Sequence, residues 1–231
     1  MRKCFLLMAA LLLSAVSLSA QLTPYEYGHR WYFAFQGGPV YFNSDYSNTL
    51  PNSRLLELFS IDAAVALGYN LTDAHELRFS GSYGLRTGVC EDFYRDDYYD
   101  DGEDVPIYTY RFHSTRLSAD YVLNMNALAE YNIAFSTKLY AGLGAALTYD
   151  FTEPEHPEVW VSDPNLTAAI RVGYILEYDF KDGFGLYFDN GLAFFPDRYN
   201  GREVIGFPAD MEIHAHLGLI YHFPLNKKHR R

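Results

Sequence analysis

Apolar and polar residues alternate with a period of two through most of the chain. In residues 58–71, apolar side chains hold the odd positions, while small or polar side chains hold most of the even ones. Because successive side chains of a strand point to opposite faces, each such segment has one apolar and one polar face. The pattern predicts eight strands, which cover residues 30–42, 58–71, 76–86, 108–124, 135–150, 166–180, 184–195 and 210–223.

The links between these strands alternate between short and long. Residues 72–74 and 181–183 form tight turns, and residues 126–131 form a moderate link. The other four links are long and polar, and they cover residues 43–54, 88–107, 151–164 and 196–209. Short turns opposite long loops are typical of bacterial membrane barrels. We therefore expect an all-β, eight-stranded antiparallel up-and-down transmembrane β-barrel, whose even strand number places both termini on the periplasmic side.

The predicted strand 108–124 changes phase. Tyr108, Tyr110 and Phe112 hold even positions, whereas the apolar side chains from Leu117 onward hold odd ones. An inserted residue would restore a common apolar face, so we predict a β-bulge near residues 113–115.

Aromatic residues make up 17% of the chain, and many fall at predicted strand ends. Two belts of aromatic side chains are typical of a barrel that meets a lipid–water boundary at both ends. The belt expected at the tight turns contains Trp31, Tyr69, Tyr121, Phe135, Tyr178, Phe180, Phe184, Tyr221 and Phe223. The belt expected at the long loops contains Tyr41, Phe59, Tyr83, Tyr108, Tyr110, Tyr149 and Phe194.

Alternation alone does not say which face points outward. A lipocalin-like soluble barrel also has eight alternating strands, with its apolar face inside. The aromatic belts and the alternating link lengths favour the membrane barrel, because a soluble barrel needs neither. The Gly-x-Trp spacing expected near the first strand of a lipocalin is also missing, since the nearest match is Gly28-His-Arg-Trp31.

The last predicted strand carries a recognisable ending. Residues His216 to Phe223 read polar-x-Gly-x-x-aromatic-x-aromatic, which resembles the signal by which outer-membrane barrels are recognised for insertion. From Gln21 to Phe223 the chain resembles, in pattern, the small eight-stranded outer-membrane proteins of the OmpA transmembrane-domain and OmpX type. That resemblance implies the bacterial outer membrane, contact with outer-membrane lipids and lipopolysaccharide, and recognition of residues 216–223 by the barrel-insertion machinery. An envelope protein partner is a further expectation.

The two ends of the chain flank the expected barrel domain, residues 21–224. Arg2 and Lys3 precede an apolar run and small residues up to Ala20, which predicts a secretory signal peptide over residues 1–20. Residues 225–231 form a basic tail that departs from the resemblance, and we expect it to be periplasmic. The net charge of −11 without a basic patch argues against a nucleic-acid partner.

Charged residues on the polar parity predict a packed lumen in which opposite charges neutralise one another. They are Asp62, Arg78, Arg116, Asp120, Lys138, Arg171, Glu177, Asp189 and Glu212. Glu212, His214 and His216 share this parity with His222 and could bind a transition metal. The alternative is that these histidines belong to the hydrogen-bonding network, and both interpretations stay open.

The link 88–107 contains the most distinctive acidic segment. Its carboxylates are Glu91, Asp92, Asp96, Asp97, Asp100, Asp101, Glu103 and Asp104. Their spacing does not match an EF-hand, but they could collect Ca²⁺ or a cationic partner, and the plain alternative is a solvated loop. We expect no other cofactor.

One segment of the sequence resembles a catalytic site. Some eight-stranded outer-membrane proteins are lipid A enzymes, and a deacylase of that kind has a His-x-Ser site. The segment of this chain that resembles it most is His113-Ser114-Thr115, where Thr stands in place of the Ser. Adjacent strand residues face opposite sides, so His113 and Ser114 should not meet unless a bulge intervenes. We therefore expect a non-enzymatic barrel whose surface loops serve structural, binding or adhesion roles. The alternatives are an accessory subunit of a larger outer-membrane assembly, such as a secretion apparatus, and an outer-leaflet lipid-modifying enzyme.

The acidic segment generates a test. If its carboxylates bind Ca²⁺, replacing Asp96, Asp97, Asp100 and Asp101 with Asn should abolish binding and leave barrel assembly intact, because Ca²⁺ requires oxygen ligands of sufficient charge. Calorimetry of the refolded wild type would measure binding directly. The absence of heat at millimolar Ca²⁺ would leave the solvated-loop interpretation.

Overall fold

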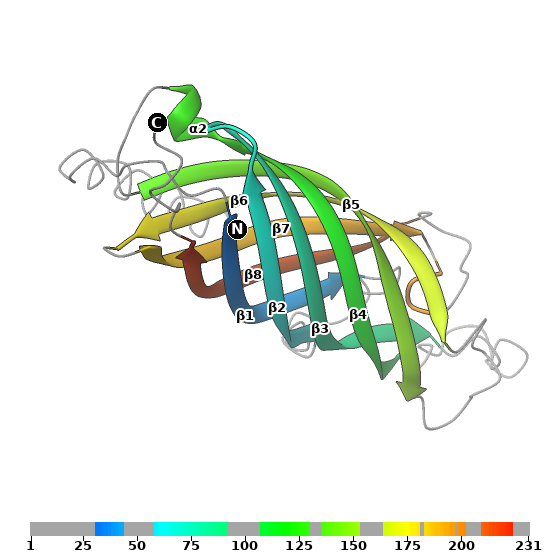
Figure 1. The fold of residues 1–231 in the computed structure, drawn as a ribbon. Coiled ribbons are helices and arrows are strands. Elements are labelled where there is room, and N and C mark those ends of the chain that lie inside the picture. Colours follow the sequence, from blue (N-terminus) through cyan, green and yellow to red (C-terminus); the bar gives the residue numbers. More distant parts are fainter. Residues whose placement is uncertain are drawn as a thin grey trace, which may run out of the picture.

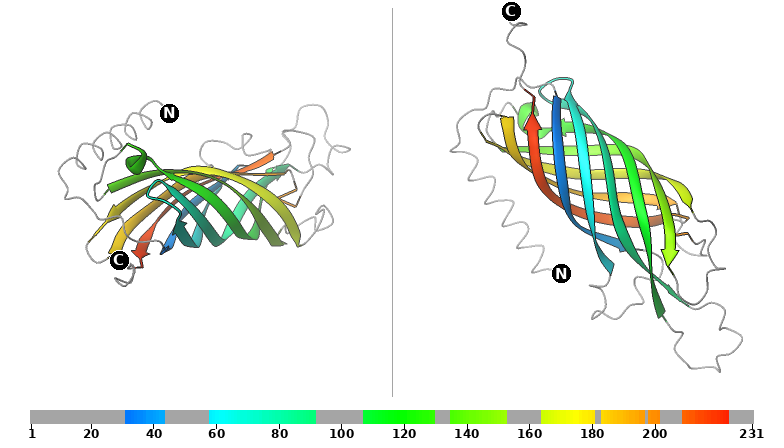
Figure 2. Two further views of the ribbon diagram at one scale, coloured as in Figure 1. Left: turned by 45° about the horizontal axis from the view of Figure 1, so that its top comes forward. Right: turned by 60° about the horizontal axis from the view of Figure 1, so that its bottom comes forward.

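The computed structural model forms one closed β-barrel of eight strands, each hydrogen-bonded to its neighbours in chain order. It describes residues 31–43, 58–91, 107–129, 135–152, 164–180, 183–196, 198–201 and 209–223. Figure 1 shows the strands side by side around the barrel wall, and Figure 2 shows that they are strongly tilted relative to the barrel axis. The fold class predicted from the alternation is confirmed.

The strands lie close to their predicted positions. They are β1 (Trp31–Asn43), β2 (Phe59–Asn70), β3 (His75–Glu91), β4 (Ile107–Asn124), β5 (Phe135–Thr152), β6 (Asn165–Asp179), β7 (Phe184–Pro196) and β8 (Ala209–His222). A one-turn helix, α2 (Met125–Leu128), follows β4 and is capped by the side chain of Asn124. Within the described segments, no helix is long and apolar enough to cross a membrane.

The barrel closes where its first strand meets its last. Strands β1 and β8 pair from Tyr32 opposite His222 to Asn43 opposite Met211, and the amide of Phe223 donates to the carbonyl of Trp31. This end also carries the links β2–β3 and β6–β7, and we call it the turn end. The opposite end, where β1, β3, β5 and β7 finish, is the loop end.

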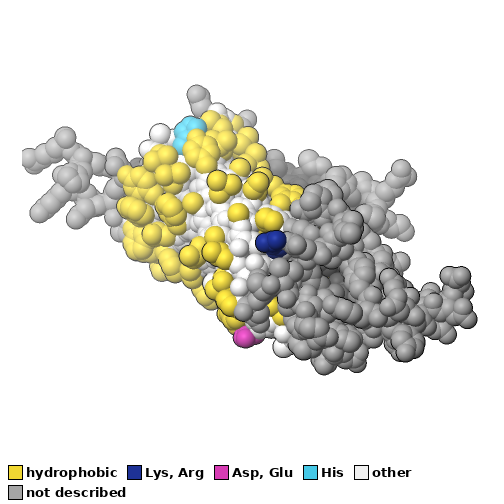
Figure 3. Space-filling view, turned by 90° about the vertical axis from the view of Figure 1, so that its right-hand side faces the viewer, with side chains coloured by type: hydrophobic (Ala, Val, Ile, Leu, Met, Phe, Trp, Pro, Cys, Tyr) yellow, Lys and Arg dark blue, Asp and Glu magenta, His cyan; other side chains and the backbone are white. Residues whose placement is uncertain are grey.

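The outer wall is apolar and the inner wall is polar. Ile61, Leu166 and Leu217 point outward with 79%, 71% and 62% of their surface exposed, while Arg78 and Glu212 are fully buried. On the face that Figure 3 shows, hydrophobic side chains cover much of the described part, and the few charged side chains lie near its edge. An apolar wall around a charged interior is the reverse of a soluble barrel, so the lipocalin-like alternative is wrong. Such a wall is stable where lipid surrounds it.

The predicted bulge in β4 is wrong. Strand β4 keeps one register with β3 from end to end, and its even positions stay buried, including Tyr110 and Phe112. The irregularity lies between β4 and β5, where Arg111 pairs with Thr152 but His113 pairs with Tyr149. Strand β5 therefore contains one more residue than β4 at this point, and Asp150 there adopts φ 53°. The phase change in the sequence instead marks an aromatic cluster inside the barrel.

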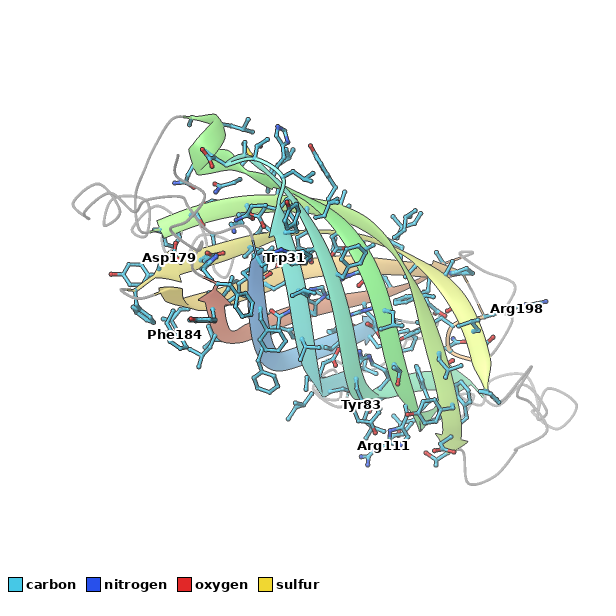
Figure 4. All side chains as sticks on the ribbon, viewed as in Figure 1. Trp31, Tyr83, Arg111, Asp179, Phe184 and Arg198 are labelled. Atoms are coloured by element: carbon cyan, nitrogen blue, oxygen red, sulfur yellow. The ribbon has the colours of Figure 1, made fainter. Side chains whose placement is uncertain are left out.

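The aromatic belts are confirmed for most described members, with one correction. Trp31, Tyr121 and Phe184 are exposed at the turn end, whereas Tyr110, which we expected at the outer surface of the loop end, is buried in the lumen. The side chain of Tyr108 lies outside the described residues. Figure 4 places Trp31 and Phe184 at one end of the barrel and Tyr83 at the other.

The outward face predicts how Leu217 responds to substitution. Leu217 lies in the middle of the barrel wall, opposite Gly37 on β1 and Phe188 on β7. Because it meets lipid tails, Leu217→Arg should lower the free energy of unfolding by about 2–4 kcal/mol. Leu217→Ala is the matched control and should cost much less, because fluid lipid leaves no fixed cavity.

Equilibrium unfolding of the refolded barrel in lipid vesicles would measure both variants. If Leu217→Ala alone cost about 2–5 kcal/mol, as in a protein core, the outward position would be contradicted.

Candidate functional site: the charged lumen

Three clusters of charged side chains fill the lumen at successive depths. The middle cluster is built around Arg78, the loop-end cluster around Arg86 and the turn-end cluster around Lys138. Strand alternation directs all these side chains inward, because they share the parity opposite the apolar wall. The packed lumen predicted from the sequence is therefore present in the described residues.

The middle cluster joins four strands through two arginines and two aspartates. Arg78 Nη2 lies 2.8 Å from Asp120 Oδ2, and Arg78 Nη1 lies 2.8 Å from Asp189 Oδ2. Arg171 reaches the same Asp120 oxygen at 3.2 Å. The guanidinium of Arg78 also lies 4.1 Å from the ring centre of Tyr140, a cation–π distance. The two arginines and two aspartates balance each other in charge.

The loop-end cluster is balanced in the same way. Arg86 contacts Glu212 Oε1 at 2.5 Å and Asp62 Oδ2 at 2.9 Å. Arg116 contacts the other oxygen of Glu212 at 2.8 Å. The planar fork of an arginine suits this bridging between carboxylates, since it presents several donors in fixed directions.

Tyr199 covers the loop-end cluster. It belongs to the segment 198–201 between β7 and β8, and its ring stacks on Phe195 with 3.8 Å between centroids. Its hydroxyl donates to Glu212 and lies 2.8 Å from the hydroxyl of Ser114, a hydrogen-bond distance. Burial raises the pKa of the Tyr199 phenol, which keeps it protonated as a donor. With Phe42 and Phe112 beside it, Tyr199 forms an aromatic cap over the charges.

The turn-end cluster differs in composition. Lys138 Nζ lies 2.7 Å from Glu76 and 2.8 Å from Glu177. His222 Nε2 lies 2.6 Å from Glu177 Oε1 and 3.4 Å from Asp179 Oδ1. Three carboxylates thus surround one lysine and one imidazole.

The residues predicted as a metal site lie in different networks. Glu212 is held by Arg86 and Arg116, whereas the Nε2 atom of His214 lies 3.4 Å from Asp189. The rings of His214 and His216 are neighbours, with centroids 4.8 Å apart. Metal binding by this histidine pair stays a prediction. The carboxylate of Glu212 forms ion pairs with Arg86 and Arg116 and lies in a different network.

The candidate catalytic pair is separated. His113 faces outward and stacks beside Tyr83, whose hydroxyl lies 2.8 Å from His113 Nδ1. Ser114 is buried on the inner wall and bonds to Tyr199. The two side chains therefore cannot act on one substrate atom together.

The remaining predicted sites lie outside the described residues. Asp92, Asp96, Asp97, Asp100, Asp101, Glu103 and Asp104 are among them, and the side chain of Glu91 is not described although its backbone ends β3. The signal peptide 1–20 and the tail 225–231 also lie outside. They stay predictions.

Four members of the lumen clusters were not predicted as site residues, namely Glu76, Arg86, Asp179 and Tyr199. Glu76 and Arg86 fall on the polar parity of their predicted strand, and this signal could have found them. Tyr199 falls in a link that reads as a long polar loop, so no periodicity places it in the barrel. Asp179 falls on the polar parity at the end of its strand, next to Glu177 on the same face, and this signal could have found it.

An apolar outer wall, a charge-paired lumen and an even antiparallel strand order define a class. The chain is a small transmembrane β-barrel of the bacterial outer-membrane type. No protein-family model matches the chain, and no curated protein matches it in sequence.

The solved structures that resemble this one are distant in sequence. Neisserial surface protein A is 13% identical, covering 84% of this chain and 97% of that one at a TM-score of 0.47. A major outer membrane protein from Thermus thermophilus is 15% identical, covering 84% and 100% at 0.47. The N-terminal β-barrel domain of Pseudomonas aeruginosa OprF is 14% identical, covering 85% and 99% at 0.43. The assignment to the class rests on the side-chain arrangement of this chain.

The loop-end cluster predicts a large cost for losing one charge. Arg86→Met leaves Asp62 and Glu212 with Arg116 alone, and breaking a buried pair typically costs about 3–5 kcal/mol. Adding Asp62→Asn restores the balance and should recover part of that free energy. Unfolding of the single and double variants in vesicles would measure both effects. A double variant less stable than Arg86→Met would contradict the proposed charge balance.

Proposed function

We propose that this protein is a non-enzymatic, non-conducting outer-membrane barrel that holds its long links on the cell surface for structural or binding roles. In this orientation the turn end and both chain termini face the periplasm. The observation that carries the proposal is the filled lumen, in which three charge clusters and an aromatic cap occupy successive depths between Lys138 and Tyr199.

The filled lumen supports a surface role because it leaves no polar path that is free of ion pairs through the described part of the barrel. In the middle cluster, Arg78 bridges from β3 across the lumen to Asp189 on β7. An ion that crossed the barrel would have to displace such buried pairs, each of which is costly to break in a low-dielectric surrounding. The chemistry available to this chain then lies at its two ends and on its outer wall.

Conductance measurements test the non-conducting role. We expect no stepwise current when the purified barrel is inserted into a planar bilayer, because the charge clusters remain even when the cap is opened. Tyr199→Ala should therefore also stay silent. A porin measured in the same bilayer controls for insertion conditions, and steady single-channel steps from the wild type would refute the proposal.

A loop exchange tests the binding role. Replacing residues 92–106 with a short Gly-Ser linker should leave the barrel assembled, because β3 still ends at Glu91 and β4 still begins at Ile107. Vesicles that carry the wild type should bind lipopolysaccharide more strongly in Ca²⁺, and this increase should disappear in the exchange variant. Exchange of residues 44–57, which contain fewer acidic residues, is the matched control. Equal binding by all three proteins would place the binding role elsewhere.

A further inference from the structure

The turn-end cluster is the one charge cluster of the described lumen that its own arginines and lysines do not balance. Two arginines face two carboxylates in each of the other clusters. At the turn end, Glu76, Glu177 and Asp179 face Lys138 alone, which leaves two negative charges when His222 is neutral. The excess matches the charge of one divalent cation.

Three ligand atoms converge within this cluster. One ligand atom each of Glu177, Asp179 and His222 lies within 4.8 Å of the other two. Ligand atoms about 2.0–2.2 Å from a tetrahedral zinc ion are roughly 3.3–3.5 Å apart. The 3.4 Å between His222 and Asp179 already fits this geometry. The 2.6 Å between His222 and Glu177 would have to open by less than about 1 Å to reach it.

The surroundings hold these ligands in place. Lys138 occupies Oε2 of Glu177 at 2.8 Å, so Oε1 is left facing His222. Asp179 lies opposite Gly185 on β7, and a Cβ there would stand 3.2 Å from Asp179 Oδ1. The glycine therefore leaves room for the carboxylate.

The ligand atoms are buried, and one of them is not satisfied. The side chains of Glu177, Asp179 and His222 are 2%, 7% and 6% exposed. Oδ1 of Asp179 has no well-formed hydrogen bond from the described residues, and its contact is the long 3.4 Å approach of His222 Nε2. A buried carboxylate oxygen without a donor is costly unless another group coordinates it.

We propose that Glu177, Asp179 and His222 bind one Zn²⁺ ion at the turn end of the barrel. The ion neutralises the two excess charges, and the mixed imidazole and carboxylate ligands suit zinc better than the all-oxygen ligands that Ca²⁺ and Mg²⁺ prefer. A water molecule would complete the tetrahedron. Figure 4 shows Asp179 at the same end as Trp31 and Phe184.

The site would fasten β8 to β6 beside the seam of the barrel. His222 pairs with Tyr32 of β1 across the closing strand pair, and Glu177 pairs with Tyr187 of β7. One ion therefore connects the strand that ends the barrel with a strand two positions away in the wall. Zinc binding would stabilise the closed form by mass action.

The experiment titrates zinc chloride into the untagged barrel, refolded in detergent and stripped of metal with a chelator. Calorimetry should show one ion per barrel, and zinc should raise the unfolding midpoint. Asp179→Asn and His222→Gln should each weaken binding by more than about 100-fold, since even outer-shell changes cost 10–100-fold. His216→Gln, opposite Asp189 of the middle cluster, and His75→Gln on the exposed face are matched controls that should bind as the wild type does.

X-ray absorption spectroscopy at the zinc edge identifies the ligands of the bound ion in the wild type, so it needs no substituted variant. One imidazole with two carboxylates supports the proposal, and it remains decisive if the substituted barrels fail to refold. Two imidazoles, or loss of binding in His216→Gln alone, would assign the ion to the His214–His216 pair instead. A wild type without zinc heat and without a midpoint shift would overturn the proposal and leave His222 as a protonated bridge between two carboxylates.

Discussion

Every charge on the inner wall must find its opposite inside the barrel, because the outer wall offers only lipid and the lumen of eight strands is too narrow for bulk water. A buried charge without a partner costs several kcal/mol, so an unmatched residue would threaten the whole fold. Arg78 illustrates the solution, since it lies between Asp120 on β4 and Asp189 on β7 and rests on Tyr140. The equal numbers of arginines and carboxylates in the middle and loop-end clusters follow from this requirement.

Size is matched across the lumen as well as charge. Tyr140 extends from β5 toward β7, where it meets Gly191, and a Cβ at Gly191 would lie 2.0 Å from the tyrosine hydroxyl oxygen. Because large side chains on one strand face glycine on another, the interior is filled without forcing the wall apart. The lumen is therefore packed as a core is packed, although most of its members are polar.

The sequence predicted the strands and their faces well, but it did not predict which face of β4 its aromatic residues occupy. Period-two alternation identifies residues that share a face, and the belts and link lengths then chose the outward one. Tyr110 and Phe112 are exceptions to this rule, because an apolar side chain near the barrel mouth can cover a charge cluster inside the barrel instead of facing lipid. Local pattern could not separate the two roles.

The sequence did not predict which residues form ion pairs with one another. Arg78 and Arg116 were expected to be neutralised inward, yet their partners depend on strand register and tilt, which no local pattern states. Asp179 and Tyr199 show the same limit at the two ends, since each acts through a neighbour that only the closed wall supplies. The inward histidines were visible in the sequence, but their separate networks were not.

The pairing of distant strands has a consequence for how the barrel forms. Arg86 and Glu212 are separated by 126 positions in the chain, and Arg78 and Asp189 by 111. A curved sheet that lacks β8 would hold Arg86 and Arg116 without Glu212, so an incomplete barrel gains little from its charged residues. Non-local contacts of this kind slow folding, because a long loop must close before they form. Assembly of the lumen should therefore be cooperative, with the last strand in the chain completing the network that the earlier strands began.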